Sequence, residues 1–136
     1  MLFRAGGERY GLPLDAVREV VIPQPPFARV PRAGGAVRGA MNLRGRVVAV
    51  VDLAALVGVG TEELRAGSGQ VVILDRERRA LGLLVGQVLG VEAVAADSTE
   101  PPGSMVRGLG QLGGGAVTLL DPDEVASRAA RLFGAS

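Results

Sequence analysis

Two carboxylate clusters are the groups in this 136-residue sequence best suited to acid–base catalysis or metal binding. One is Glu62-Glu63, in a polar stretch typical of a solvated linker. The other is Asp121, Asp123 and Glu124. It has the pattern of a helix start, with an Asp cap, Pro122 in the first helical position and an acid three residues after the cap. Capping and solvation therefore account for both clusters, and we predict no chemistry from either.

Three residue types that carry much of enzyme chemistry are missing from the sequence. There is no Cys, no His and no Lys, and all 15 basic residues are Arg. These absences remove thiol nucleophiles, imidazole bases, ordinary zinc sites and Schiff bases. The net charge of +1 argues against a strong electrostatic footprint for nucleic acid. We therefore expect no enzyme activity, no cofactor, no metal and no nucleic-acid partner.

A glycine cluster and an arginine cluster are two further candidates for phosphate binding. Gly113–Gly115 is not followed by Lys-Ser or Lys-Thr, and no GxGxxG motif opens a helix there, so a hairpin turn is favoured over a phosphate loop. The basic residues Arg76, Arg78 and Arg79 are interleaved with Asp75 and Glu77, which is typical of a solvated hairpin tip. Neither segment predicts anion binding.

The elements that must position any functional residue are mainly strands. Short apolar runs rich in Val, bounded by Gly, Pro or charges, fill most of the chain. The predicted strands are Leu2–Ala5, Arg9–Leu12, Ala36–Leu43, Arg46–Leu53, Gln70–Asp75, Ala80–Leu89, Val106–Leu112 and Ala116–Leu120. Hairpin turns are predicted at Arg44-Gly45, Arg76–Arg79 and Gly113–Gly115, where glycine supplies positive φ.

Helical signals are fewer. Leu14–Val20 and Ala54–Val57 predict one or two turns each. A C-terminal helix is predicted after Asp121, because Val125, Ala129, Leu132 and Phe133 recur on one face. The ranges 22–35 and 58–69 are interpreted as an ordered connection and a central linker.

An internal repeat organises the chain. Val37–Asp52 matches Val106–Asp121 at an offset of 69, with seven of sixteen positions identical. Gly11–Val20 matches Gly82–Val91 more weakly, at an offset of 71. Chance similarity among Val- and Gly-rich strands is the alternative, but two blocks in the same order favour duplication. Residues 1–67 and 68–136 are then two small barrels of about five strands, packed together with a groove between them.

Membrane insertion is not expected from the sequence. No apolar run approaches the ~20 residues that a spanning helix needs. The range from Met1 to Gly7 lacks a charged region followed by a long apolar stretch. We expect a soluble, cytoplasmic protein.

Several segments of the sequence resemble one known family. The segment Gly39–Leu53, GAMNLRGRVVAVVDL, resembles the signature of the CheW-like family of bacterial chemotaxis coupling proteins. Tyr10–Val21, Val71–Val94 and Gly108–Val125 resemble other segments of that family in the same order. The resemblance implies a mostly β fold of two pseudo-repeated five-stranded SH3-like barrels, packed together, with a C-terminal α-helix.

The resemblance also implies a function. Members of the family are non-enzymatic scaffolds that bridge the cytoplasmic tips of chemoreceptors to the regulatory domain of the histidine kinase CheA. The implied location is the receptor array at the inner membrane face, and the implied assembly is a ring with other CheW-like domains. The family often has Asp at the position of Gly86, so any contact which that acid makes is not expected here.

Nine residues match positions that the family uses for kinase or receptor contact. They are Val17, Glu19, Gly39, Asn42 and Arg44 in the first barrel, and Val71, Gly82, Val88 and Val91 in the second. Barrel packing or turn geometry is the alternative for the valines and Gly82. Arg44 and Glu19 are the stronger candidates, because neither charge belongs in a small core without a partner. Arg44 also stands at a hairpin tip, where a guanidinium can fork onto a partner's carboxylate.

Other functions stay open on the sequence alone. A CheW-like adaptor can serve another kinase pathway, such as motility or development. A β-barrel that binds a small ligand or nucleic acid is a further alternative, and an enzyme is the least favoured because His, Cys and Lys are absent.

Overall fold

Strands and short helices make up most of the computed structural model, which describes residues 1–23, 27–29, 34–60, 69–76 and 79–132. A five-stranded sheet has the order β3-β6-β7-β5-β4. Its strands are β3 (Val17–Val21), β4 (Val37–Leu43), β5 (Arg46–Asp52), β6 (Gln70–Arg76) and β7 (Arg79–Val85). A six-stranded sheet has the order β8-β1-β2-β11-β10-β9. Its strands are β1 (Leu2–Ala5), β2 (Glu8–Gly11), β8 (Gln87–Gly90), β9 (Ala96–Thr99), β10 (Val106–Leu112) and β11 (Gly115–Leu120).

Each sheet is completed by a hairpin from the other half of the sequence. The hairpin β1–β2 lies beside β8 and β11, and the hairpin β6–β7 lies beside β3 and β5. The exchange is reciprocal, because β2 pairs with β11 in parallel just as β7 pairs with β5 in parallel. The expected boundary after residue 67 therefore separates the sequence repeats but not the sheets. The boundary itself falls among residues 61–68, outside the described residues.

The mostly β fold with a C-terminal helix is confirmed, with three differences in its elements. The second sheet has six strands instead of about five. The additional strand, β9, was not predicted because it is exposed and polar and has no apolar period. The one or two helical turns predicted over Leu14–Val20 are confirmed only at the start of that range. Only Leu14–Ala16 forms a 3₁₀ turn, η1, and the β-branched residues that follow pair with β6 as β3. The strand predicted over Ala80–Leu89 breaks at Gly86, where the chain passes from one sheet to the other.

The two helices begin at equivalent positions of the repeat. Asp52 caps α1 (Leu53–Val57), and its Oδ1 accepts a hydrogen bond from Ala55 N at 3.3 Å. Asp121 caps α2 (Pro122–Arg131) through Asp123 N at 3.0 Å, as the sequence predicts. The same two carboxylates form ion pairs with Arg38 and Arg107, at 3.4 and 3.5 Å. The predicted helical position Phe133 lies outside the described residues.

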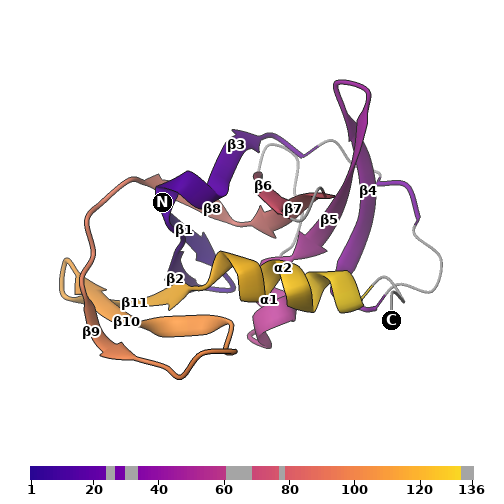
Figure 1. Ribbon diagram of the computed structural model, residues 1–136. Helices are drawn as coiled ribbons and strands as arrows, with labels where there is room; N and C mark the ends of the chain where they lie inside the picture. Colours follow the sequence, from indigo (N-terminus) through magenta and orange to yellow (C-terminus); the bar gives the residue numbers. More distant parts are fainter. Residues whose placement is uncertain (24–26, 30–33, 61–68, 77–78, 133–136) are drawn as a thin grey trace.

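The main core lies between the sheets and under both helices. Figure 1 shows α2 crossing the junction of the two sheets. Side chains from both halves meet there, including Phe3, Leu53, Leu74, Leu83 and Val125. A smaller core fills the five-stranded sheet and is made of Met41, Val48, Val50, Val71, Ile73 and Leu84. No helix in the described part of the chain is long and apolar enough to cross a membrane.

Tyr10 is a titratable residue in the main core, and the ionisation of its phenol can be followed directly. It is buried and stacks on Phe3, and its hydroxyl donates a hydrogen bond to Glu8 Oε2 at 3.2 Å. Burial, together with the nearby Glu8 carboxylate, raises the pKa of Tyr10 to about 12. Because the folded pKa lies above the ordinary value of about 10, folding favours the neutral phenol.

We expect the free energy of unfolding to fall as the pH rises from about 10 to about 12, and this contribution to be complete below pH 10. Tyr10 is the only Tyr and there is no Trp, so the change in absorbance at 295 nm reports the ionisation of this group alone. Tyr10→Phe should remove the alkaline loss of stability. A phenol that ionises near pH 10 in the folded protein would contradict the expectation.

Candidate functional site

The tip of the β4–β5 hairpin has an uncommon backbone conformation. Arg44 has a φ of 52° and Gly45 a φ of 82°, so both central residues of the predicted two-residue turn are left-handed. Gly45 N donates to Asn42 Oδ1 at 2.8 Å, which closes the turn. Asn or Gly usually occupies the first of these central positions, whereas Arg is disfavoured there. Turn chemistry therefore does not explain why Arg stands at this position.

The guanidinium of Arg44 forms an ion pair with the carboxylate of Glu19 on β3. The two residues come from opposite ends of the strand order, so the pair bridges the edges of the curled sheet. Arg44 keeps 67% of its side chain exposed. Exposed pairs of this kind contribute roughly 0–1 kcal/mol to stability. The two stronger candidates among the predicted contact residues are thus brought together in one ion pair.

A groove of about 120 Å³ runs beside this ion pair. Its lining includes apolar side chains, three arginines and one glutamate. The lining residues are Arg18, Glu19, Leu43, Arg44, Arg46, Val48, Ile73 and Ala80. Guanidinium groups beside apolar side chains suit a protein surface that offers carboxylates and a small apolar side chain. Sequence reasoning did not single out Arg18 and Arg46, because the curl that brings β3 to the β4–β5 tip is not visible in the local pattern.

Three predicted contact residues shape the five-stranded sheet instead of lining its surface. Val71 is 0% exposed and belongs to the smaller core. A Cβ atom added to Gly82 would lie 2.7 Å from Val71 Cγ1, so this glycine makes room for that valine. Gly39 has a φ of 140° and faces the backbone of Ala28. Val71 and Gly82 therefore pack against each other within the sheet, and neither offers a side chain to the surface.

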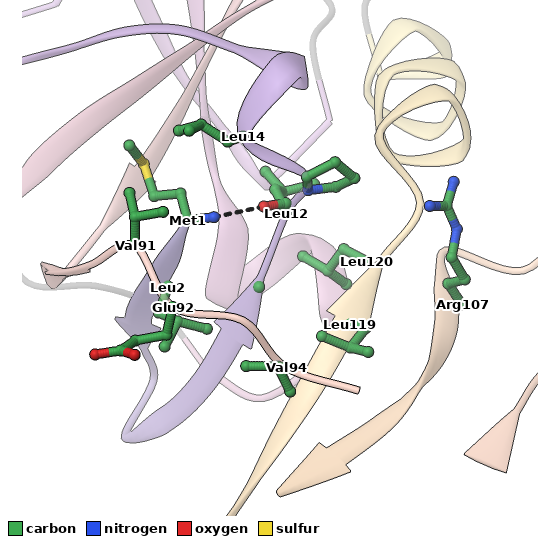
Figure 2. A pocket seen from close by; sticks show the side chains of 12 residues that line it. Met1, Leu2, Leu12, Leu14, Val91, Glu92, Val94, Arg107, Leu119 and Leu120 are labelled. Carbon is green, nitrogen blue, oxygen red and sulfur yellow. Dashed lines mark hydrogen bonds between the residues drawn. The ribbon is translucent and has the colours of Figure 1, made fainter. Parts of the chain in front are cut away.

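The other three predicted valines lie near the junction of the sheets. Val17 and Val88 are half-buried against the main core. Val91 is 58% exposed and stands with Leu14, which is 53% exposed, at the mouth of a second hollow. Figure 2 shows this hollow, with the Met1 ammonium donating to Leu12 O at 2.7 Å. Leu14 was not predicted as a site residue, because its segment was predicted to form helical turns.

Among the described residues, no group of three or more acidic side chains is placed to hold a metal ion. Asp121 caps α2 and pairs with Arg107. Glu62-Glu63 lies outside the described residues, and so does the tip of the β6–β7 hairpin at residues 77–78. Gly113 and Gly114 have φ values of 60° and 79°, which confirms the predicted turn.

Comparison with known proteins decides the family. The model of the CheW-like domain matches residues 1–130. The chain belongs to the CheW-like domain family. The resemblance to this family, first seen in the Gly39–Leu53 segment, is thereby confirmed and extends over nearly the whole chain.

Relatives of this CheW-like chain include proteins named CheW, PilI and CheA. It is 29% identical over 113 residues to Chemotaxis protein CheW of Thermotoga maritima, covering 79% of this chain and 74% of that protein. It is 29% identical over 96 residues to Protein PilI of Pseudomonas aeruginosa, covering 71% of this chain and 53% of PilI. It is 33% identical over 123 residues to Chemotaxis protein CheA of Salmonella typhimurium, covering 88% of this chain but 18% of CheA.

The fold of the CheW-like chain is also that of a solved structure. The scaffolding protein TtCheW from Thermoanaerobacter tengcongensis superposes with a TM-score of 0.76 at 24% identity. The match covers 88% of this chain and 81% of that one. It confirms the arrangement of two β-sheets.

Proposed function

We propose that this chain is a non-enzymatic scaffold that couples chemoreceptors to a CheA-type histidine kinase through protein–protein contacts. The observation that supports this most directly is the family match over residues 1–130, with chemotaxis proteins CheW among the relatives. The similarity to a part of CheA supports contact between related barrels, since the kinase carries a segment like this chain. The protein acts in the cytoplasm, in receptor arrays at the inner membrane face, and forms rings with other CheW-like domains.

The Arg44–Glu19 pair and its groove are the contact surface in this proposal. Arg44 is held outward by the left-handed turn, and its guanidinium has donors left for a partner's carboxylate. Asn42 fixes the turn. Val17, Val88 and Val91 lie at the junction of the sheets, where a second partner binds. Val71, Gly82 and Gly39 act indirectly, by holding the strands in place.

Direct binding tests the proposal. Purified protein is titrated with the CheA regulatory domain and with a chemoreceptor cytoplasmic fragment, both from the organism that encodes this chain. We expect a dissociation constant below roughly 100 μM for each, which is about −5.5 kcal/mol. Absence of binding to both at that concentration would overturn the assignment.

The similarity to PilI favours one alternative, a CheW-like adaptor in a different kinase pathway, such as motility or development. The two functions differ in which kinase and receptor are bound. Parallel titrations with the CheA-type kinases of the same organism distinguish them, because the cognate kinase binds more tightly than the others.

Arg44→Ala should separate binding from stability. Because the guanidinium is mainly exposed, its removal should shift the melting temperature by no more than about 2 °C. Its loss should weaken binding of at least one partner roughly tenfold. Isothermal titration and thermal unfolding measure the two effects.

The matched control is Arg128→Ala, which removes an exposed arginine from α2. It should change neither the affinity nor the melting temperature. A large loss of stability in Arg44→Ala with unchanged affinity would make Arg44 a structural residue and contradict the proposal for this surface.

A further inference from the structure

Two arginines lie directly opposite each other in the β1–β2 hairpin. Arg4 of β1 and Arg9 of β2 are partners in the antiparallel register, so their side chains project from the same face of the six-stranded sheet. The Cβ atoms of such partners are about 4.5–5.5 Å apart, and like charges at this separation destabilise a sheet. Two guanidinium groups in this arrangement therefore need a physical reason.

The internal repeat shows that the fold itself does not require this pair. The hairpin β6–β7 is the equivalent of β1–β2 at the offset of 71. Its partners at the same place in the register are Asp75 and Ala80. An acidic residue and a small neutral one therefore satisfy the backbone geometry of this hairpin, and the opposed arginines are a property of β1–β2 alone.

The guanidinium of Arg9 is held in a fixed position. Its Nη2 donates a hydrogen bond to Leu112 O at 2.6 Å, at the end of β10. A Cβ atom added to Gly115 would lie 2.5 Å from the same Nη2, so this glycine leaves the room in which the guanidinium lies. A guanidinium has five N–H donors, and the bond to Leu112 leaves others for a ligand. Arg9 is thus positioned before any ligand binds, which lowers the entropic cost of binding.

The guanidinium of Arg4 is exposed and has no ion pair or hydrogen bond with any residue that the structure describes. The acidic residue of the same hairpin, Glu8, does not neutralise the pair by direct contact. Its Oε2 accepts a hydrogen bond from the Tyr10 hydroxyl at 3.2 Å, and it forms no ion pair with Arg4 or Arg9. The repulsion between the two arginines is therefore not relieved within the hairpin.

Both arginines line a hollow of about 430 Å³ formed by the β1–β2 hairpin and β11, which lie side by side in Figure 1. The lining residues are Arg4, Gly7, Glu8, Arg9, Ala116 and Thr118. Two guanidinium groups and a threonine hydroxyl can donate hydrogen bonds to an oxyanion, and guanidinium pairs with carboxylate or phosphate through parallel N–H···O bonds. Because Glu8 offsets the charge of one arginine, a single carboxylate balances the hollow, whereas a phosphate dianion leaves an excess of negative charge.

We propose that Arg4 and Arg9 together bind one carboxylate, the side chain of an Asp or Glu on the surface of a partner protein. The exposed Arg4 and the fixed Arg9 make this hairpin a receptor for an acidic segment, and the bound carboxylate relieves the repulsion between them. The contact goes beyond the proposed scaffold function. It belongs to the six-stranded sheet, whereas the Arg44–Glu19 groove belongs to the five-stranded sheet.

Thermal unfolding without a ligand tests the repulsion. Arg4→Gln removes one of the opposed charges, and Arg128→Gln makes the same change in net charge at an exposed site on α2. At about 10 mM ionic strength, Arg4→Gln should raise the melting temperature by about 1–4 °C, and Arg128→Gln should not raise it. The gain should vanish in 1 M NaCl, where charges are screened beyond about 3 Å. No gain at low salt, or a gain that persists in 1 M NaCl, would overturn the proposal.

Titration with an acidic peptide tests the ligand. Acetyl-Glu-Glu-Glu-amide should shift the NMR signals of Arg9 Nε–H and of the Gly115 amide, whereas acetyl-Gln-Gln-Gln-amide should not. We expect Arg4→Gln to bind the acidic peptide at least roughly fivefold more weakly than the parent protein, and Arg128→Gln to bind it like the parent.

Arg4→Lys distinguishes a guanidinium site from a site that needs only positive charge. It should bind the acidic peptide less tightly than the parent but more tightly than Arg4→Gln, because an ammonium keeps the charge and loses the planar fork. Inorganic phosphate at the same ionic strength should bind more weakly than the peptide. Tighter binding of phosphate would make the hollow a site for a small anion, and equal binding of the peptide by Arg4→Gln and the parent would exclude Arg4 from it. Either result would overturn the proposal and leave the scaffold function as it stands.

Discussion

Phe3→Ala is expected to lower the free energy of unfolding by about 3–5 kcal/mol, the usual cost of removing a buried aromatic side chain. Phe3 is 0% exposed, and its ring centroid lies 6.4 Å from that of Tyr10. It stands on β1, which comes from the first half of the sequence but completes the sheet formed by the second half. The cavity therefore opens in the core that joins the two sheets.

This location predicts how the variant unfolds as well as how stable it is. Both sheets share the core around Phe3, so they should be lost together in one urea transition. Circular dichroism and NMR signals from β4–β5 and from β10–β11 should give the same midpoint. Ile22→Ala, at an exposed position, is the control and should cost less than about 0.5 kcal/mol. Separate midpoints for the two sheets would show that the halves fold independently and would contradict the exchange of hairpins.

Gly39→Ala should be the second most damaging change, at about 2–4 kcal/mol. Gly39 has a φ of 140°, a conformation that side chains rarely adopt. A Cβ atom there would also lie 2.6 Å from Ala28 O and 2.6 Å from Phe27 Cβ. The first neighbour is backbone and pairs with Ala40 through hydrogen bonds of 2.8 Å, so it has no rotamer by which to move aside.

Thermal unfolding measures this cost, and Gly35→Ala is the matched control. Gly35 has no atom within 4 Å of an added Cβ and no positive φ, so its substitution should be nearly neutral. Binding of the partners by Gly39→Ala should recover when the temperature is lowered well below its melting point, since Gly39 acts through the fold. A stable Gly39→Ala variant that has lost binding would instead make Gly39 a contact residue.

Local sequence signals placed most of the elements. Asp52 and Asp121 cap their helices because an Asp before an apolar turn satisfies free N–H groups whatever the rest of the chain does. The turns at Arg44-Gly45 and Gly113-Gly114 followed from glycine between Val-rich runs. β3 was missed because its residues alternate too weakly for a strand to be distinguished from a short helix.

Only part of the candidate site could be predicted from the sequence before the fold was known. Glu19 and Arg44 were chosen for their charge and for the resemblance of their segments, and the structure joins them in an ion pair. Val71 and Gly82 match the same family pattern, but they pack against each other inside the sheet. A residue type and its place in a motif do not say which face of a strand meets solvent when the sheet is curled.

What the sequence determined by itself was the repeat, the strands and turns that compose it, and the absence of His, Cys and Lys. Tertiary structure alone decided that each half lends its first hairpin to the other. The reason is physical. Duplicated halves present equivalent strand edges, so the local pattern is the same whether a hairpin pairs with its own half or with the other, and only the packing of the shared core chooses between them.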